Sequence, residues 1–160
     1  MLVRHAPGDA SDLGQRPLLP ALVTAWIFST EPEVFPWSRV ERDKTVRWDG
    51  IRGPLARKNM RCLEVGDRVY GYHATPEKAL VCEARVARAA YPDPADEKWL
   101  ALDVAFVRWL PRPVPLAALR AAPELVKTDF LRIPRLSVAP LTVAEERALR
   151  VLFKQEASPC

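Results

Sequence analysis

Histidine, cysteine and glycine are all scarce in this sequence, and each shortage argues against a class of site. The two histidines, His5 and His73, are too few for a histidine-rich metal site. The three cysteines, Cys62, Cys82 and Cys160, form no CxxC pair, which argues against a disulfide framework and is typical of reduced thiols in the cytoplasm. The six glycines occur singly, so no glycine-rich phosphate loop is present. We therefore predict a cytoplasmic protein without a metal or cofactor.

Long apolar runs are missing as well. No stretch approaches the roughly 18 consecutive apolar residues of a membrane helix, so we expect no membrane partner. The N-terminal segment lacks the continuous apolar core of a signal peptide. Residues 1–20 are polar and carry several prolines and glycines, which predicts a flexible N-terminal extension. The remaining length fits one domain, which we place at residues 21–156.

The order of apolar patterns predicts an α+β domain. Strands are expected at residues 21–28, 68–73, 79–91 and 99–110, with short extended pieces within 129–141. Helices are expected at 38–42 with Ser38 as cap, at 55–63 after Pro54, at 116–125 with a break at Pro123, and from the capping box Thr142–Glu145 to about Lys154. These elements do not alternate as βαβ units, so we predict five or six strands in a small curled sheet or barrel with short peripheral helices.

The positive charge is concentrated in one segment. Residues 37–61 carry eight basic residues against three acidic ones, a balance of +5, whereas the rest of the chain sums to −1. A charge run alone is usually an ordinary solvated surface, but this one is accompanied by aromatic residues. Rings can stack on bases while cations neutralise phosphates, so nucleic acid is the favoured partner. The aromatic residues in the first half of the chain are Trp26, Phe28, Phe35, Trp37, Trp48, Tyr70 and Tyr72.

Trp48 stands out because it lies in the charged, glycine-flanked stretch RWDGIRG at residues 47–53. The stretch does not alternate like a half-buried strand, and Gly53-Pro54 would break a helix, so we place Trp48 on a turn. A tryptophan in that position either lines a binding pocket or anchors the loop against the core. The sequence leaves both interpretations open.

An enzyme is the alternative from another class. His73 could act as a base with Ser29, Ser137 or Cys82 as the nucleophile of a small hydrolase or transferase. No GxSxG elbow supports such a site, and a lone histidine is more often a structural residue. We therefore favour a binding module, with an enzyme that uses His73, or a small-molecule or protein-interaction module, as alternatives.

Five motifs, in order along the chain, resemble the EVE domain family. They are WIFSTEP at 26–32, WDGIR at 48–52 followed by Ala56-Arg57 and Asn59, Gly66-Asp67 with Tyr72-His73, YPDP at 91–94, and RLSV at 135–138. The resemblance runs from about Trp26 to Leu152. It implies a PUA-like pseudo-barrel, related to YTH domains, with a pocket that holds a nucleobase in DNA or RNA without doing chemistry on it. Such a base is often modified, as in 5-methylcytosine or 5-hydroxymethylcytosine.

The resemblance also implies a set of site residues. The positions implied for the base are Ser29, Thr30, Trp48, Asp49, Gly50, Arg52, Asn59, Tyr72, His73, Arg135 and Ser137. In the basic segment we expect Arg47, Arg57 and Lys58 to contact the phosphate backbone. Gly53-Pro54-Leu55 stands where the family commonly has Asn-Tyr-Gln, and Ser29 stands where it commonly has lysine.

Overall fold

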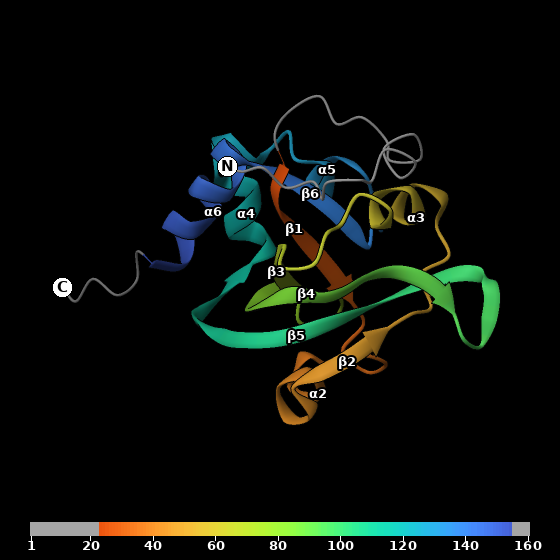
Figure 1. Ribbon diagram of the computed structural model, residues 1–160. Coiled ribbons are helices and arrows are strands. Elements are labelled where there is room, and N and C mark those ends of the chain that lie inside the picture. The colour runs from red at the N-terminus through yellow and green to blue at the C-terminus, as the bar shows by residue number, and fades with distance from the viewer. Residues whose placement is uncertain (1–22, 155–160) are drawn as a thin grey trace.

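The computed structural model describes residues 23–154, and its strands form one six-stranded mixed sheet (Figure 1). The predicted extension at 1–20 lies outside the described residues. The sheet order is β2-β5-β4-β3-β1-β6; β1 and β3 are parallel, and all other neighbours are antiparallel. The strands are β1 (Val23–Thr30), β2 (Thr45–Trp48), β3 (Arg68–His73), β4 (Ala79–Asp93), β5 (Asp96–Pro115) and β6 (Val138–Thr142).

Short helices surround the sheet. In Figure 1, α2 lies beside β2 at one end of the molecule, and α4 and α6 lie close together at another. The helices are α2 (Trp37–Asp43), α3 (Pro54–Met60), α4 (Leu116–Ala121), the 3-10 helix η1 (Pro123–Leu125), α5 (Asp129–Arg132) and α6 (Val143–Lys154). Residues 23–154 contain no helix that is both long and apolar enough to span a bilayer.

The long β4–β5 hairpin determines how the sheet curls. β5 pairs with β4 along one edge and with β2 along the other, so it lies inside the sheet rather than at its border. Several register shifts interrupt the β4–β5 pairing, and such bulges bend strands and increase their twist. β1 and β2 are separated by three strands in the sheet order, yet Phe28 of β1 stacks on Trp48 of β2. The sheet therefore wraps around a shared interior without closing, which confirms the predicted α+β pseudo-barrel.

The C-terminal helix forms as predicted from its capping box. The Thr142 backbone N–H donates to Glu145 Oε1 at 3.0 Å, and the Glu145 N–H donates to Thr142 Oγ1 at 3.2 Å. The helix at 116–125 is also broken as predicted, because α4 ends before Pro123 and η1 begins there.

Three local predictions need correction. Residues 45–48 form strand β2 rather than a turn, with Val46 and Trp48 buried and their neighbours exposed. Because β2 is only four residues long, it depends on its pairing with β5. The turn begins after Trp48. Ser38 does not cap α2, which begins at Trp37 without a side-chain cap. The short helix α5 was not predicted; it is capped by Thr128, whose Oγ1 accepts from the Leu131 N–H.

Adjacent residues of β3 contact helices on opposite faces of the sheet. Tyr70 and Tyr72 lie against Phe153 of α6 and Phe130 of α5. Gly71 lies against the ring of Trp37 in α2 instead. The molecule therefore has two layers of side chains, one between β3 and the helices α5 and α6, and the other between β3 and α2. Residues of β3 that belong to different layers cannot share a site.

Candidate nucleic-acid interface

A cluster of buried aromatic rings lies between β1, β2 and α2. The ring centroids of Phe28 and Trp48 are 4.4 Å apart with 26° between their planes, so the two rings are stacked. Phe35 lies 6.2 Å from Trp48 and 5.7 Å from Trp37, edge-on to the latter. Trp48 is only 4% exposed, as expected for a ring that anchors β2 to the core. Its role as a pocket wall stays a prediction.

Trp37 brings an unusual polar atom into this cluster. Its side chain is fully buried, and its Nε1 has no hydrogen-bond partner among the described residues. A buried donor without an acceptor costs about 1–3 kcal/mol. The aromatic cluster therefore carries a donor that no described residue satisfies.

His73 holds α2 onto the sheet. Its Nε2 accepts the backbone N–H of Trp37 at 3.1 Å, and its Nδ1 lies 2.7 Å from Glu77 Oε1. Because Nε2 is the acceptor, the ring proton is assigned to Nδ1. Within residues 23–154, the recorded hydrogen-bond partners of His73 include neither a serine nor a cysteine. The geometry therefore gives His73 a positioning task beside the aromatic cluster.

The predicted polar residues from three strands converge at one end of the sheet. The Ser29 N–H donates to the Ser137 carbonyl at 2.9 Å, which joins the end of β1 to the residue before β6. The Ala74 N–H donates to the Thr30 carbonyl at 2.8 Å, which adds the end of β3. The hydroxyl of the buried Thr30 donates to the Phe35 carbonyl at 2.8 Å and fixes the following turn.

Asn59 ties α3 to the same end of the sheet. Its Nδ2 donates to the Val138 carbonyl at 2.8 Å, so this buried amide links α3 to the first residue of β6. The exposed Arg135 precedes β6 with a φ of 61°. Asn59 therefore contacts the first residue of β6, and Arg135 and Ser137 lie in the segment just before it.

Tyr72 is separated from these residues by the alternation of β3. Its ring lies 4.8 Å from that of Phe130, on the layer opposite His73 and Trp37. Burial raises the pKa of the Tyr72 phenol above its usual value, and the charge of Arg120 opposes this shift. The structure therefore does not place Tyr72 with the Trp48 cluster, although the two residues belong to the same predicted site.

The basic residues on either side of Trp48 are exposed, except for Arg57, which is half-buried. Arg47 Nε contacts Asp49 Oδ2 at 3.0 Å, and Gly50 turns the chain with a φ of 83°. Arg52 and Arg57 lie over the ring of Trp99, with Cζ atoms 4.4 and 4.8 Å from its centroid. Lys58 is exposed on α3.

Sequence reasoning missed Trp99, Phe35 and Trp37 as neighbours of the site. Phe35 and Trp37 were recognised only as part of an aromatic-rich region. Trp99 lies at the start of a strand, and its contact with α3 depends on how the β4–β5 hairpin is placed. The available clue was the Lys98-Trp99 pair shortly after the YPDP motif, since cations are attracted to the faces of tryptophan rings.

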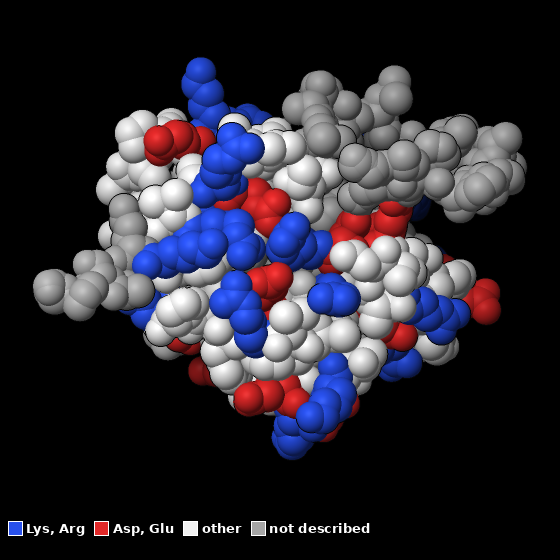
Figure 2. Space-filling view, turned by 60° about the vertical axis from the view of Figure 1, so that its left-hand side comes forward, with Lys and Arg blue, Asp and Glu red and all other residues white. Residues whose placement is uncertain are grey.

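A second charged surface lies around α6, where basic and acidic side chains gather together (Figure 2). Arg68 Nε contacts Glu146 Oε2 at 2.9 Å, and the Tyr70 hydroxyl donates to the same oxygen at 2.7 Å. Arg108 contacts Glu83 in the same way, with N–O distances of 2.9 and 3.1 Å. Arg68 and Arg108 are therefore neutralised by glutamates that are themselves mostly shielded from solvent.

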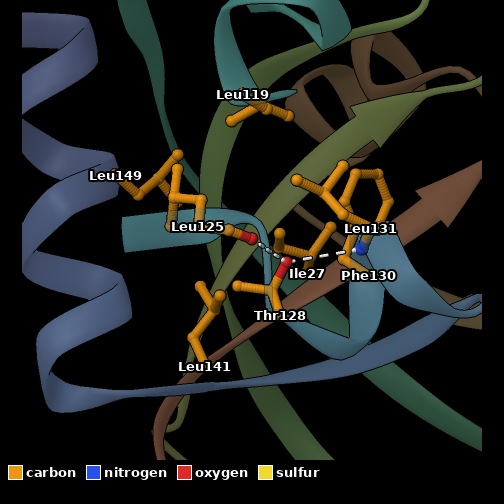
Figure 3. A pocket seen from close by; sticks show the side chains of 8 residues that line it. All are labelled: Ile27, Leu119, Leu125, Thr128, Phe130, Leu131, Leu141 and Leu149. Carbon is orange, nitrogen blue, oxygen red and sulfur yellow. Dashed lines mark hydrogen bonds between the residues drawn. The ribbon is translucent and has the colours of Figure 1, made fainter. Parts of the chain in front are cut away.

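A small apolar hollow lies between β1 and the helices that follow β5 (Figure 3). Thr128 is its polar lining residue, and its hydroxyl donates to the Leu125 carbonyl at 2.7 Å and accepts from the Leu131 N–H at 3.3 Å. These local bonds satisfy Thr128, so the hollow is poorly suited to a nucleobase, which needs polar partners. The lining residues are Ile27, Leu119, Leu125, Thr128, Phe130, Leu131, Leu141 and Leu149.

Metal binding gains no support from the side chains. In the part of the chain that the structure describes, no group of three or more His, Cys, Asp or Glu residues is arranged to hold a metal ion.

A curled mixed sheet with short helices, and an aromatic cluster beside a basic surface, defines an α+β domain of the PUA-like class. The chain belongs to the EVE domain family, whose model matches residues 24–152. This match confirms the resemblance found in the five motifs.

Relatives and solved structures agree with this assignment. Human thymocyte nuclear protein 1 is 28% identical over 178 residues, covering 86% of this chain and 77% of that protein. A crystal structure from Pseudomonas putida has a TM-score of 0.76 and 31% identity, covering 81% of this chain and 99% of that one. The structure of human THYN1 in complex with 5-methylcytosine-containing DNA has a TM-score of 0.73 and 24% identity, covering 85% of this chain and 99% of that one. The similarity to this last structure supports the assignment of the fold.

Proposed function

We propose that this protein is a non-catalytic nucleic-acid-binding domain that holds a modified base such as 5-methylcytosine or 5-hydroxymethylcytosine. The observation that carries the proposal is the stacked Phe28–Trp48 pair, which lies where β2 leads into the basic stretch with Arg52 and Arg57. Membership of the EVE family supports it, because the structure of a human relative contains 5-methylcytosine DNA.

The proposed site combines three kinds of contact. The aromatic cluster provides an apolar wall for the base, and Trp37 Nε1 is a buried donor without a described acceptor. The half-buried side chains of Ser29 and Ser137, where β1 ends and β6 begins, would meet the edge of the base. Cations after Trp48 neutralise the flanking phosphates. The base-contact positions remain those proposed from the resemblance, except that Tyr72 lies on the other layer.

A non-catalytic role is favoured over the hydrolase alternative by the surroundings of His73. Both ring nitrogens have partners, the Trp37 N–H and the Glu77 carboxylate. A general base must reach the proton that it abstracts, and here Nε2 already accepts a backbone N–H. We therefore assign His73 to the support of α2.

Titration of labelled oligonucleotides with the full chain tests this function. Matched oligonucleotides carry cytosine, 5-methylcytosine or 5-hydroxymethylcytosine, in single- and double-stranded form and at two salt concentrations. We expect binding that weakens with salt. One buried methyl group contributes about 0.8 kcal/mol, so the preference for the methylated base should be about fourfold. Absence of salt-dependent binding to every oligonucleotide would contradict the proposal.

A further inference from the structure

The arginines of this protein are held in two chemically different ways. One group contacts carboxylates, and the other lies over aromatic rings; Arg108 does both, because its Cζ also lies 5.8 Å from the centroid of Phe153. In the first group, Arg42, Arg47, Arg68, Arg108 and Arg132 contact Asp43, Asp49, Glu146, Glu83 and Asp129 respectively. In the second group, Arg52 and Arg57 lie over Trp99, and Arg88 lies over Tyr91 with its Cζ 3.8 Å from the ring centroid.

The difference matters for anion binding. A carboxylate neutralises the guanidinium and occupies its N–H donors. An aromatic ring instead contacts the flat face of the guanidinium, so the positive charge remains and the donors along its edge stay available. Phosphate is recognised through these edge donors, often by two parallel hydrogen bonds. The arginines over Trp99 therefore suit a phosphate better than those tied to carboxylates.

Trp99 gathers cations from two separate elements of the chain. Arg57 belongs to α3 and Arg52 to the loop before it, whereas Lys98 precedes the ring on β5 with its Nζ 5.8 Å from the centroid. Among the described residues, no carboxylate forms an ion pair with Arg52 or Arg57. Like charges held close together repel each other, and a bound anion relieves that repulsion.

The burial of Arg57 is a second indication of an anion site. Its Nε is buried without a hydrogen-bond partner among the described residues, so part of its guanidinium has lost water without gaining an acceptor. Such desolvation costs free energy. An arginine that is already partly desolvated and held on a ring needs less ordering when it binds an anion.

We propose that Arg52 and Arg57, held on the ring of Trp99, bind the phosphate backbone of the nucleic acid. Trp99 is the positioning residue of this phosphate contact. The proposal rests on the proposed function and adds the start of β5 to the interface. It also changes the expected phosphate contacts. Arg57 is still expected to contact a phosphate, and Arg52 is now assigned to the phosphate backbone instead of the base. Arg47 contributes less to phosphate binding because its Nε donates to Asp49.

The test compares four variants of the full chain with labelled methylated and unmodified duplexes over a series of salt concentrations. The double variant Arg52→Ala/Arg57→Ala removes both cations. Trp99→Ala removes the ring without changing charge, and Trp99→Phe retains a ring. Arg132→Ala is the matched control, because Arg132 is exposed and paired with Asp129 on α5.

We expect the double variant to reduce the slope of log K against log salt by about 2, because each phosphate contact contributes roughly 0.9. Trp99→Ala should weaken binding to both duplexes by the same factor, roughly tenfold, and reduce the slope. Trp99→Phe should restore most of both losses, whereas Arg132→Ala should match the wild type. Circular dichroism and thermal unfolding of each variant identify any loss of fold.

The possible failures are distinguishable. If the wild type shows no salt-dependent binding, the proposed function and this inference fail together. If the wild type binds but the double variant keeps the wild-type slope, the inference is wrong and the proposed function stands. If inorganic phosphate at matched ionic strength displaces the duplex at low millimolar concentration, a free anion is the ligand, and the assignment to nucleic acid is overturned.

Discussion

The ring of Trp48 stacks on the ring of Phe28 at 4.4 Å, although their strands are separated by β3, β4 and β5 in the sheet order. This contact crosses the interior of the curled sheet and fastens one end of it to the strand near the other. The same residue pair therefore links the curvature of the fold to the proposed base site.

Replacement of Trp48 should test both roles at once. Trp48→Ala removes a ring that is 4% exposed and should lower the free energy of unfolding by about 3–5 kcal/mol. Trp48→Phe keeps part of the stack on Phe28 and should cost less. Urea unfolding of both variants measures the stability, and oligonucleotide titration of Trp48→Phe tests the site in a folded protein. A fully stable Trp48→Ala variant would show that the stack does not fasten the sheet.

Glycine is required at position 71 because α2 lies directly on β3 there. A Cβ atom on Gly71 would overlap the ring of Trp37 and come within 2.7 Å of Cys82 Sγ. Gly71→Ala should therefore destabilise the fold by about 1–3 kcal/mol. Gly53→Ala is the matched control, since its Cβ would meet only Ala56 at 4.0 Å and its φ is −65°. Equal melting temperatures for the two variants would contradict the close approach of α2.

The bond between His73 and the Trp37 N–H predicts a structural effect. His73→Ala leaves that buried N–H without its acceptor and should cost about 1–3 kcal/mol of stability. Glu77→Ala removes the other partner, whose side chain is 43% exposed, and should cost less than about 1 kcal/mol. Chemical denaturation of both variants provides the measurement. A His73→Ala variant as stable as Glu77→Ala would show that this bond does not hold α2.

Alkaline pH should unfold the protein through its three tyrosines. Burial and the bond to Glu146 raise the pKa of Tyr70, burial raises that of Tyr72, and burial together with the bond to Asp103 raises that of Tyr91 to about 12. Each pKa is higher in the folded state than the ordinary value of 10.0. This part of the stability is therefore complete below pH of about 10 and is lost as the pH rises through the folded pKa values.

Tyrosinate absorbance and tryptophan fluorescence, followed together during an alkaline titration, measure this effect. We expect ionisation to be delayed relative to free tyrosine and to coincide with loss of the native fluorescence. Ionisation of all three tyrosines at the ordinary pKa in a protein that remains folded would contradict the burial of the phenols.

Local rules of sequence predicted much of the fold. The capping box at Thr142 and Glu145 determines where α6 begins, because both of its hydrogen bonds join residues three positions apart. Alternation identified β3, and Pro123 marked the break after α4. The EVE motifs identified the family because their residues lie close together in the chain. Each of these features depends on neighbours within a few residues.

Only the tertiary structure decided the arrangement of the site. Strand β2 exists because β5 pairs with it, so four residues that look like a loop alternate between buried and exposed. The pleat of β3 places Tyr72 and His73 on opposite layers, although they are adjacent in the sequence. Arg52 and Arg57 meet Trp99 because the β4–β5 hairpin brings the start of β5 beside α3. Composition and spacing cannot specify such contacts, because they depend on strand register and on the curvature of the whole sheet.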